Sequence, residues 1–436
     1  MNRYDLAYSV GLGVSAPFWL LKGSTRRKLL SAMRLRGGRV SKREGDAPAV
    51  MIHAVSVGEI NATPALVRLL VNAKPDLQII ISVTTETGRD RAFAIYENVP
   101  SVKVIRYPLD FSGAVTRVLD AVRPDVVVLM ELELWPNFLR QCEARDIPVI
   151  LANGRLTEKS YRNYKRGGAV TRAMFQRLSV ACVQDELYAQ RFIDCGVPAD
   201  RVKVLGTMKF DNAQIADALG GAADLAHAVG LHPGKEPIWV CGSTGPGEEE
   251  IILNVYRKLL QKQPRLRLAI VPRHPQRFDE VAYLIEDMKF TPVRRSAAFV
   301  PIDPAIPPVI LGDTMGELRL FYSNADVVFV GRSLVDLGQS QHGSDMIEPA
   351  ALGKPVIVGP FTTNFSDAVR KLKAAEGLLE VKDADGLEEA VGFCLTLPAE
   401  GQKMGRRAQT VVLREQGSTA RHTAVVFQQL SQRLSR

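Results

Sequence analysis

The chain has 436 residues, more than one hydrophobic core usually serves, so we expect two domains. Its hydrophobic content of 46% and charged content of 24% are typical of a globular protein rather than a disordered one. The five cysteines include no C-x-x-C pair and the six histidines form no H-E-x-x-H pattern, which argues against a disulfide framework and a zinc site.

The formal net charge of +9 is concentrated near the N-terminus. Residues 22–43 hold nine Lys or Arg residues and no Asp or Glu, and the rest of the chain has 47 basic and 47 acidic residues. The apolar run 6–21 just before this cluster has 16 residues, whereas a spanning helix needs about 20. The charge follows the apolar run, which is the reverse of a signal peptide. We therefore predict that residues 1–47 lie on, or dip into, an anionic cytoplasmic leaflet.

Two other interpretations of this segment stay open. The apolar run is also compatible with an N-terminal helix that packs on the protein itself, followed by a solvated basic linker. Nucleic acid binding is the weaker alternative because no recognisable nucleic-acid motif accompanies the cluster, so we expect no nucleic acid partner.

Short apolar runs alternate with helical stretches over residues 48–212. Nearly continuous apolar runs are typical of strands that are buried on both faces of a parallel sheet. The alternation predicts a doubly wound, Rossmann-like α/β domain. The expected strands are 49–57, 77–85, 102–108, 125–131, 147–153, 180–184 and 202–206.

The same alternation begins again after an Ala/Gly-rich stretch, 211–237, which we expect to contain the linker. It predicts a second Rossmann-like domain over 213–401, followed by helix over 402–436. The expected strands of this domain are 237–243, 266–274, 307–313, 325–331 and 354–360.

Polar residues follow several strands of the first domain, where ligands of open α/β sheets collect. Glu59 comes after the first strand, and Glu131 and Glu133 come after the fourth. The segment NGRLTEKSYRNYKR, which includes Arg155, follows the fifth strand and carries five Lys or Arg residues. Glu59 is either a base that faces a substrate or a first-turn carboxylate that complements a helix dipole, and these residues alone do not decide between the two.

Three groups in the second domain are candidates for a nucleotide site. Ser243 and Thr244, with nearby backbone amides, are placed to bind a phosphate, although a plain turn fits equally. Arg273 and His274 follow a strand and are either a phosphate clamp or a surface pair. Glu348 is either a ribose ligand or a helix-starting glutamate.

The segment EPAALGKPVIVGP resembles the donor-site signature of two-domain, GT-B-type glycosyltransferases, which have two Rossmann-like domains facing a central cleft. An ordered set of motifs between Met51 and Phe365 resembles the Kdo (3-deoxy-D-manno-octulosonic acid) transferase family of lipopolysaccharide assembly more closely. These motifs are SVGE, ELELWPN, NGRLTEKSYRNY, GTMKFD, PRHP, DTMGEL and FVGRSLV.

The resemblance implies that the N-terminal domain takes a phosphorylated lipid A precursor (lipid IVA) at the cytoplasmic side of the inner membrane, and that the C-terminal domain takes CMP-Kdo. It implies Kdo transfer with inversion, with Glu59 as the base and no metal or other cofactor. Glu131, Glu133, Arg155 and Lys209 match motifs on the acceptor side. The implied nucleotide contacts are Arg273, His274, Met315, Gly316, Glu317 and Glu348, with Ser243 and Thr244 beside them.

The sequence departs from the family pattern at three places. Arg332 stands where the family usually has glycine, Asp345 where it usually has asparagine, and Gly245–Pro246 where a His-Glu pair is usual. Two rival functions stay open, and the altered glycine loops bear on the second of them. One is another GT-B enzyme, such as a hexosaminyl transferase or a nucleotide-sugar 2-epimerase. The other is a catalytically silent nucleotide- or lipid-binding protein on the same scaffold.

Overall fold

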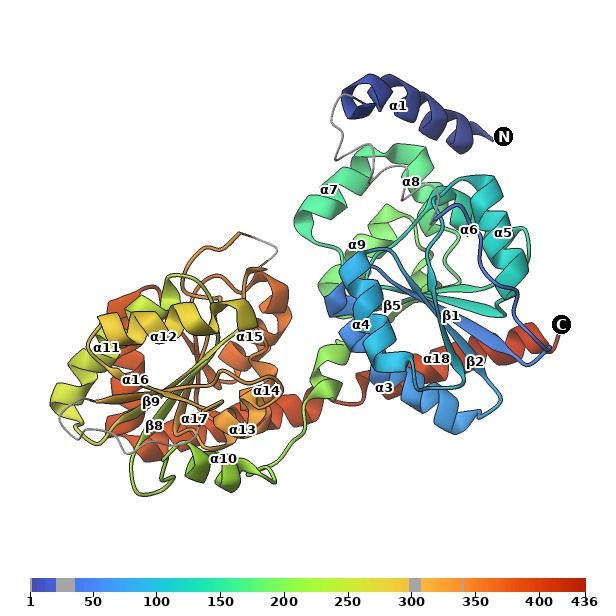
Figure 1. The fold of residues 1–436 in the computed structure, drawn as a ribbon. Coiled ribbons are helices and arrows are strands. Elements are labelled where there is room, and N and C mark those ends of the chain that lie inside the picture. Colours follow the sequence, from blue (N-terminus) through green and yellow to red (C-terminus); the bar gives the residue numbers. More distant parts are fainter. Residues whose placement is uncertain (1, 21–35, 298–306, 339–340) are drawn as a thin grey trace. The chain divides into compact units, whose positions relative to one another are not determined.

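The computed structural model describes residues 2–20, 36–297, 307–338 and 341–436. The chain forms two compact units, each built around its own sheet (Figure 1). The first unit contains residues 1–212 and 417–436, and the second contains residues 213–416.

The first unit has a seven-stranded parallel sheet in the order β3-β2-β1-β4-β5-β6-β7. Chain order reverses direction at β1 and β4, which is the switch point of a doubly wound sheet. The strands are β1 Ala49–Ala54, β2 Gln78–Val83, β3 Val102–Arg106, β4 Val126–Met130, β5 Val149–Gly154, β6 Val180–Val183 and β7 Val202–Val204.

Helices cover both faces of this sheet. One apolar core joins Val118, Phe138 and Phe175 to one face, and a second joins Leu66 and Val426 to the other. The helices are α3 Val57–Ala73, α4 Glu86–Tyr96, α5 Ser112–Val122, α6 Pro136–Glu143, α7 Glu158–Arg166, α8 Gly168–Phe175, α9 Glu186–Cys195 and α18 Ser418–Leu434.

The N-terminal apolar segment forms helix α1, Arg3–Leu20. The buried carboxylate of Asp5 accepts hydrogen bonds from the Ser112 backbone N–H at 2.8 Å and from Asn137 Nδ2 at 3.1 Å. The start of α1 is therefore tied to the first unit by polar contacts, whereas Leu6 and Val10 are 53% and 56% exposed. Among the described residues, no helix is both long enough and apolar enough to cross a bilayer.

The predicted basic cluster is only partly described, since its residues 22–35 lie outside the described residues. Arg36 donates from Nε to the Tyr107 carbonyl at 2.9 Å, and Arg43 donates from Nε to the Val122 carbonyl at 2.8 Å. These two guanidinium groups therefore help to hold the segment before β1 against the first unit, a role that the sequence did not indicate.

The second unit also has seven parallel strands, in the order β10-β11-β9-β8-β12-β13-β14. The strands are β8 Ile238–Thr244, β9 Arg267–Pro272, β10 Thr291–Arg294, β11 Pro308–Leu311, β12 Val327–Val330, β13 Val356–Val358 and β14 Leu378–Glu380. The helices are α10 Ala222–Ala228, α11 Glu248–Lys262, α12 Phe278–Asp287, α13 Leu318–Ser323, α14 Ile347–Ala351, α15 Ser366–Ala374, α16 Ala384–Thr396 and α17 Pro398–Glu415. The prediction of two doubly wound α/β domains is confirmed.

The range 402–436, expected as helix, contains most of α17 and all of α18. The break falls at Gly417, whose φ of 90° lies in the left-handed region. Asp211 caps the start of α18 because its carboxylate accepts from the backbone N–H groups of Gly417 and Thr419. This contact joins the last helix to the first unit.

Candidate functional site

Glu59 lies in the first turn of α3, directly beyond the carboxyl end of β1. Ser56 is the N-cap, and its hydroxyl accepts from the Glu59 backbone N–H at 3.4 Å. The Glu59 carboxylate in turn accepts from the Val55 N–H and from the Ser56 hydroxyl, each at 2.9 Å. This reciprocal arrangement resembles a capping box, so Glu59 also stabilises the start of the helix.

The pKa of Glu59 is raised to about 7, chiefly because burial disfavours the charged form. The two hydrogen bonds lower it, while the negative charges of Glu131 and Glu133 raise it further. A carboxylate with a pKa near neutrality is suited to take a proton from a hydroxyl and to release it afterwards.

Glu131 and Glu133 follow β4, the neighbour of β1 in the sheet. Glu131 has a φ of 56° and donates its backbone N–H to the Ala152 carbonyl at 2.9 Å. Glu133 accepts from Trp135 Nε1 at 3.0 Å, and burial raises the pKa of Glu133. The structure thus brings the three predicted carboxylates of the first unit to one edge of the sheet.

Arg155 and Lys209 are both half-buried residues of this unit. The Arg155 backbone N–H donates to the Glu131 carbonyl at 3.4 Å, which brings the segment after β5 beside the segment after β4. Asn153 accepts from the Met208 N–H at 3.1 Å, and this bond fixes the segment that carries Lys209. The structure therefore joins the predicted NGRL and GTMK motifs.

Arg273 and His274 follow β9 in the second unit, and the Arg273 backbone N–H donates to the Thr244 carbonyl at 3.1 Å. The pKa of His274 is lowered by burial and by the positive charges of Arg332, Arg273 and Arg277. Arg332 therefore belongs to the same cationic group, although its sequence position marked it only as a departure from a family pattern.

The loop between β8 and α11 is fixed by the side chain of Glu248. This fully buried carboxylate accepts from the backbone N–H groups of Gly245, Arg332, Ser333 and Leu334 at 2.6–2.9 Å. The Gly245 amide is thus already engaged. Ser243 and Thr244 are also buried, and Thr244 Oγ1 has no partner among the described residues.

Glu348 is a half-buried residue of α14, and its pKa is raised to about 7 by burial and by the negative charge of Asp345. The positive charges of Arg319 and Arg273 act in the opposite direction. Two guanidinium atoms of Arg319, Nε and an Nη, are buried without a partner among the described residues. Arg319 is a candidate that sequence reasoning missed, because it belongs to no recognised motif.

The residues of the DTMGEL segment differ in whether they already have partners in the protein. Glu317 accepts from an Nη of Arg295 at 2.9 Å and from the Thr314 hydroxyl, so its carboxylate already has protein partners. Met315 is 71% exposed, and Gly316 has a φ of 88°. Of this motif, the Met315–Gly316 turn is the part that is open to a ligand.

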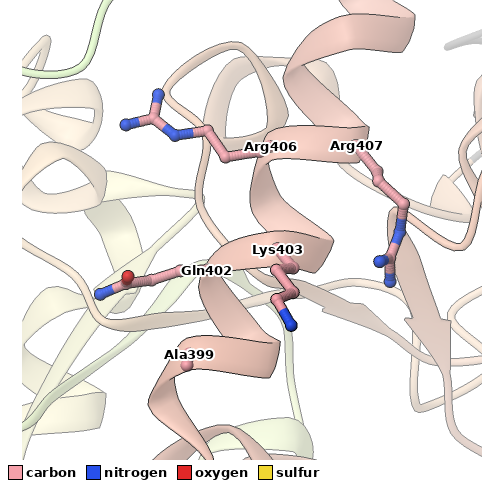
Figure 2. A pocket seen from close by; sticks show the side chains of 5 residues that line it. All are labelled: Ala399, Gln402, Lys403, Arg406 and Arg407. Carbon is pink, nitrogen blue, oxygen red and sulfur yellow. The ribbon is translucent and has the colours of Figure 1, made fainter.

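A separate hollow, whose lining side chains Figure 2 shows, lies along α17. Its volume is about 530 Å³. Its lining residues are Ala399, Gln402, Lys403, Arg406 and Arg407. Each of its cations already has a partner in the protein, and Lys403, for example, pairs with Glu400 at 2.8 Å. Among the described residues, no group of three or more His, Cys, Asp or Glu side chains is placed to hold a metal ion.

Comparison with known proteins places these motifs in a family. Residues 31–212 match the family described as 3-deoxy-D-manno-octulosonic-acid transferase (kdotransferase). Over 373 residues the chain is 38% identical to the 3-deoxy-D-manno-octulosonic acid transferase of Haemophilus influenzae, and the match covers 85% of each protein. The chain belongs to the Kdo transferase family. The Kdo transferase of Bordetella pertussis is 34% identical over 381 residues, with 86% of each protein covered.

Solved structures agree with the fold. The UDP-GlcNAc 2-epimerase from Neisseria meningitidis, bound to UDP-GlcNAc, matches with a TM-score of 0.53 and 17% identity, covering 84% of this chain and 99% of that one. At such low identity the likeness shows the GT-B fold alone. The chain is therefore a glycosyltransferase of the Kdo transferase family with a GT-B fold, as its motifs predicted.

Proposed function

We propose that the protein transfers Kdo from CMP-Kdo to a phosphorylated lipid A precursor, with inversion at the anomeric carbon. The names of its relatives support Kdo as the sugar that is transferred. The observation that carries the mechanism is the Glu59 carboxylate, which has a pKa of about 7 at the carboxyl edge of the first sheet. There it takes the proton of an acceptor hydroxyl as that oxygen attacks the sugar.

The second unit takes the nucleotide in this proposal. Arg273 and His274 face the phosphate, on which negative charge grows as CMP leaves. Glu348 accepts the ribose hydroxyls, and Met315 and Gly316 line the nucleotide beside Glu317. Ser243 and Thr244 support the phosphate side.

The first unit takes the acceptor. Arg155 and Lys209 supply positive charge for a phosphorylated lipid. Burial keeps the pKa of Glu59 high, and repulsion from Glu131 and Glu133 raises it further. We place the protein on the cytoplasmic face of the inner membrane. The exposed Leu6 and Val10 on α1, followed by the basic cluster, suit an anionic lipid surface.

The direct test is to incubate the protein with CMP-Kdo and lipid IVA, and to look for the added sugar by mass spectrometry. Transfer of Kdo supports the proposal. If the folded protein transfers no Kdo but is stabilised against heat by CMP, it is a nucleotide-binding protein without this activity. Stronger thermal stabilisation by UMP or UDP than by CMP would favour another GT-B enzyme.

A further inference from the structure

Arg332 and Arg273 flank the end of β8 from opposite sides. β12 and β9 are the two neighbours of β8 in the sheet. Arg273 donates its backbone N–H to the Thr244 carbonyl, and a Cβ on Gly331 would stand 2.6 Å from Thr244 Cα. The Arg332 side chain passes over the loop, because its Cγ lies 3.0 Å from where a Cβ on Gly245 would stand.

The backbone of Arg332 is in a conformation that favours glycine. Its φ is 58°, in the left-handed region, where a side chain other than glycine is strained. The Glu248 carboxylate holds this backbone by accepting from the Arg332 N–H at 2.6 Å. The loop therefore keeps an arginine where glycine would cost less conformational energy.

The Arg332 side chain has an acidic neighbour in Glu248, but that carboxylate already accepts from four backbone N–H groups. Its Nε is buried with no hydrogen-bond partner among the described residues. The positive charge of Arg273 acts on it as well. A buried donor without a partner and a cluster of like charges both destabilise the folded protein. The three cations that line the hollow along α17 differ, because each of them has a partner in the protein.

We propose that Arg332 contacts the phosphate of the bound nucleotide, together with Arg273, and stabilises it as the leaving group. This inference rests on the proposed function. In the reaction, the bond between the anomeric carbon and the phosphate oxygen breaks and its electron pair stays on that oxygen. The acceptor oxygen forms the new bond, and its proton goes to Glu59. An anion between the two guanidinium groups offsets their repulsion and satisfies the open donor.

The test compares CMP with cytidine, which lacks the phosphate, on wild type and Arg332→Gly. Loss of a charge-assisted hydrogen bond should weaken CMP binding by about 10- to 100-fold, measured by calorimetry. Cytidine binding, measured by competition, should not change. The melting temperature should stay the same or rise, because glycine fits the left-handed backbone. Arg332→Lys should retain part of the CMP affinity because it keeps the charge.

Lys403→Ala is the matched control, since it removes one positive charge from the same unit at an exposed, paired position. It should leave the affinity for CMP unchanged. Unchanged CMP affinity in Arg332→Gly, or an equal loss for CMP and cytidine, would overturn the proposal. If wild type binds UMP or UDP and not CMP, the proposed donor is wrong. Comparing that nucleotide with uridine on wild type and Arg332→Gly then still tests whether Arg332 contacts the phosphate.

Discussion

The two units place opposite charges at the same edge of similar sheets. In the first unit, the strand ends carry Glu59, Glu131 and Glu133, whose carboxyl groups are partly removed from water. In the second unit, the strand ends carry the guanidinium groups of Arg273 and Arg332, whose positive charges act on each other. The two units have similar sheets, so it is the residues that follow the strands that suit one unit to proton removal and the other to anion binding.

The two seven-stranded sheets differ in how many strands lie on each side of their first strand: two and four around β1, but three and three around β8. In the second unit, β11 lies between β9 and β10, whereas the corresponding strands β2 and β3 of the first unit are direct neighbours. Both sheets keep the switch point, which lies between β1 and β4 in the first unit and between β8 and β12 in the second. The charged groups cluster at these switch points, where open α/β sheets bind their ligands.

The largest effect is expected from removing the base of the first unit. Glu59→Gln keeps the shape of the side chain but cannot accept a proton, so turnover should fall by about 10²–10⁴-fold. The affinity for CMP should hardly change, because Glu59 is not among the proposed nucleotide contacts. Initial rates at saturating donor and acceptor, together with calorimetry on CMP, test this separation.

The fold of this variant needs its own control, since Glu59 also caps α3. Circular dichroism and thermal unfolding should show a folded protein, as glutamine keeps one oxygen that can accept from Val55 or Ser56. A well-folded variant that retains more than about a tenth of wild-type turnover, with chemistry rate-limiting, would exclude Glu59 as the base. Glu131 and Glu133 would then be the next carboxylates to test.

A smaller effect is expected from the carboxylate of the second unit. Glu348→Ala should weaken CMP binding by about 1.5–3 kcal/mol, because a charge-assisted hydrogen bond to the ribose is lost. Deoxy-CMP should bind wild type and variant almost equally poorly. Calorimetry that finds unchanged CMP affinity in a folded Glu348→Ala protein would contradict the placement of the ribose.

The pH dependence sharpens the contrast between the two carboxylates. Because the ionised form of Glu59 is the base, kcat/KM should fall about tenfold per pH unit below its pKa of about 7. Glu133→Gln should move this limb to lower pH, because it removes a negative charge that raises the pKa of Glu59. Glu348 also has a pKa of about 7, so the Glu348→Ala profile is the control and should keep the limb.

The same shift has a consequence for stability. Burial raises the pKa of Glu59 from 4.5 to about 7, so the folded state binds this proton more tightly than the unfolded state. Its contribution to the free energy of unfolding is full below about pH 4.5 and is lost as pH rises through 7. Urea unfolding of Glu59→Gln should therefore lack this part of the pH dependence. A profile identical to wild type would argue against the raised pKa.

The smallest effect concerns the membrane. Replacing Leu6 and Val10 with serine should weaken binding to anionic liposomes severalfold, because less apolar surface enters the lipid. Binding should also weaken as salt rises. Deleting residues 1–22 should leave CMP binding intact but, unlike the double variant, should lower thermal stability. The deletion removes Asp5, which accepts from the Ser112 N–H and hydroxyl and is one of two acceptors of Asn137 Nδ2. Sedimentation with liposomes that is absent or independent of salt would contradict the membrane role.

Most of the fold could be predicted because buried parallel strands are continuous apolar runs. The sequence did not predict β10 and β14, which form the two edges of the second sheet. An edge strand has a partner on one side only and is less enclosed, and here Pro292 and Glu380 interrupt the apolar pattern.

The candidate site could be predicted in part, through residues that directly follow strands or match motifs. Arg319 lies in the short helix α13, and no local pattern connects it to Glu348. The role of Glu248 was equally hidden, because its partners Arg332, Ser333 and Leu334 are more than 80 residues away in the chain. Such roles depend on which loops pack together, and one sequence does not record that.

The return of α18 to the first unit has a consequence for how the chain folds as it is synthesised. The core of the first unit includes Val425, Val426 and Leu430, so that unit stays incomplete until the last helix has been made. The second unit is one continuous segment, 213–416, so all of its residues have been synthesised before α18 is made. We therefore expect the second unit to reach its native state first on the ribosome, although its first residue is translated after residue 212.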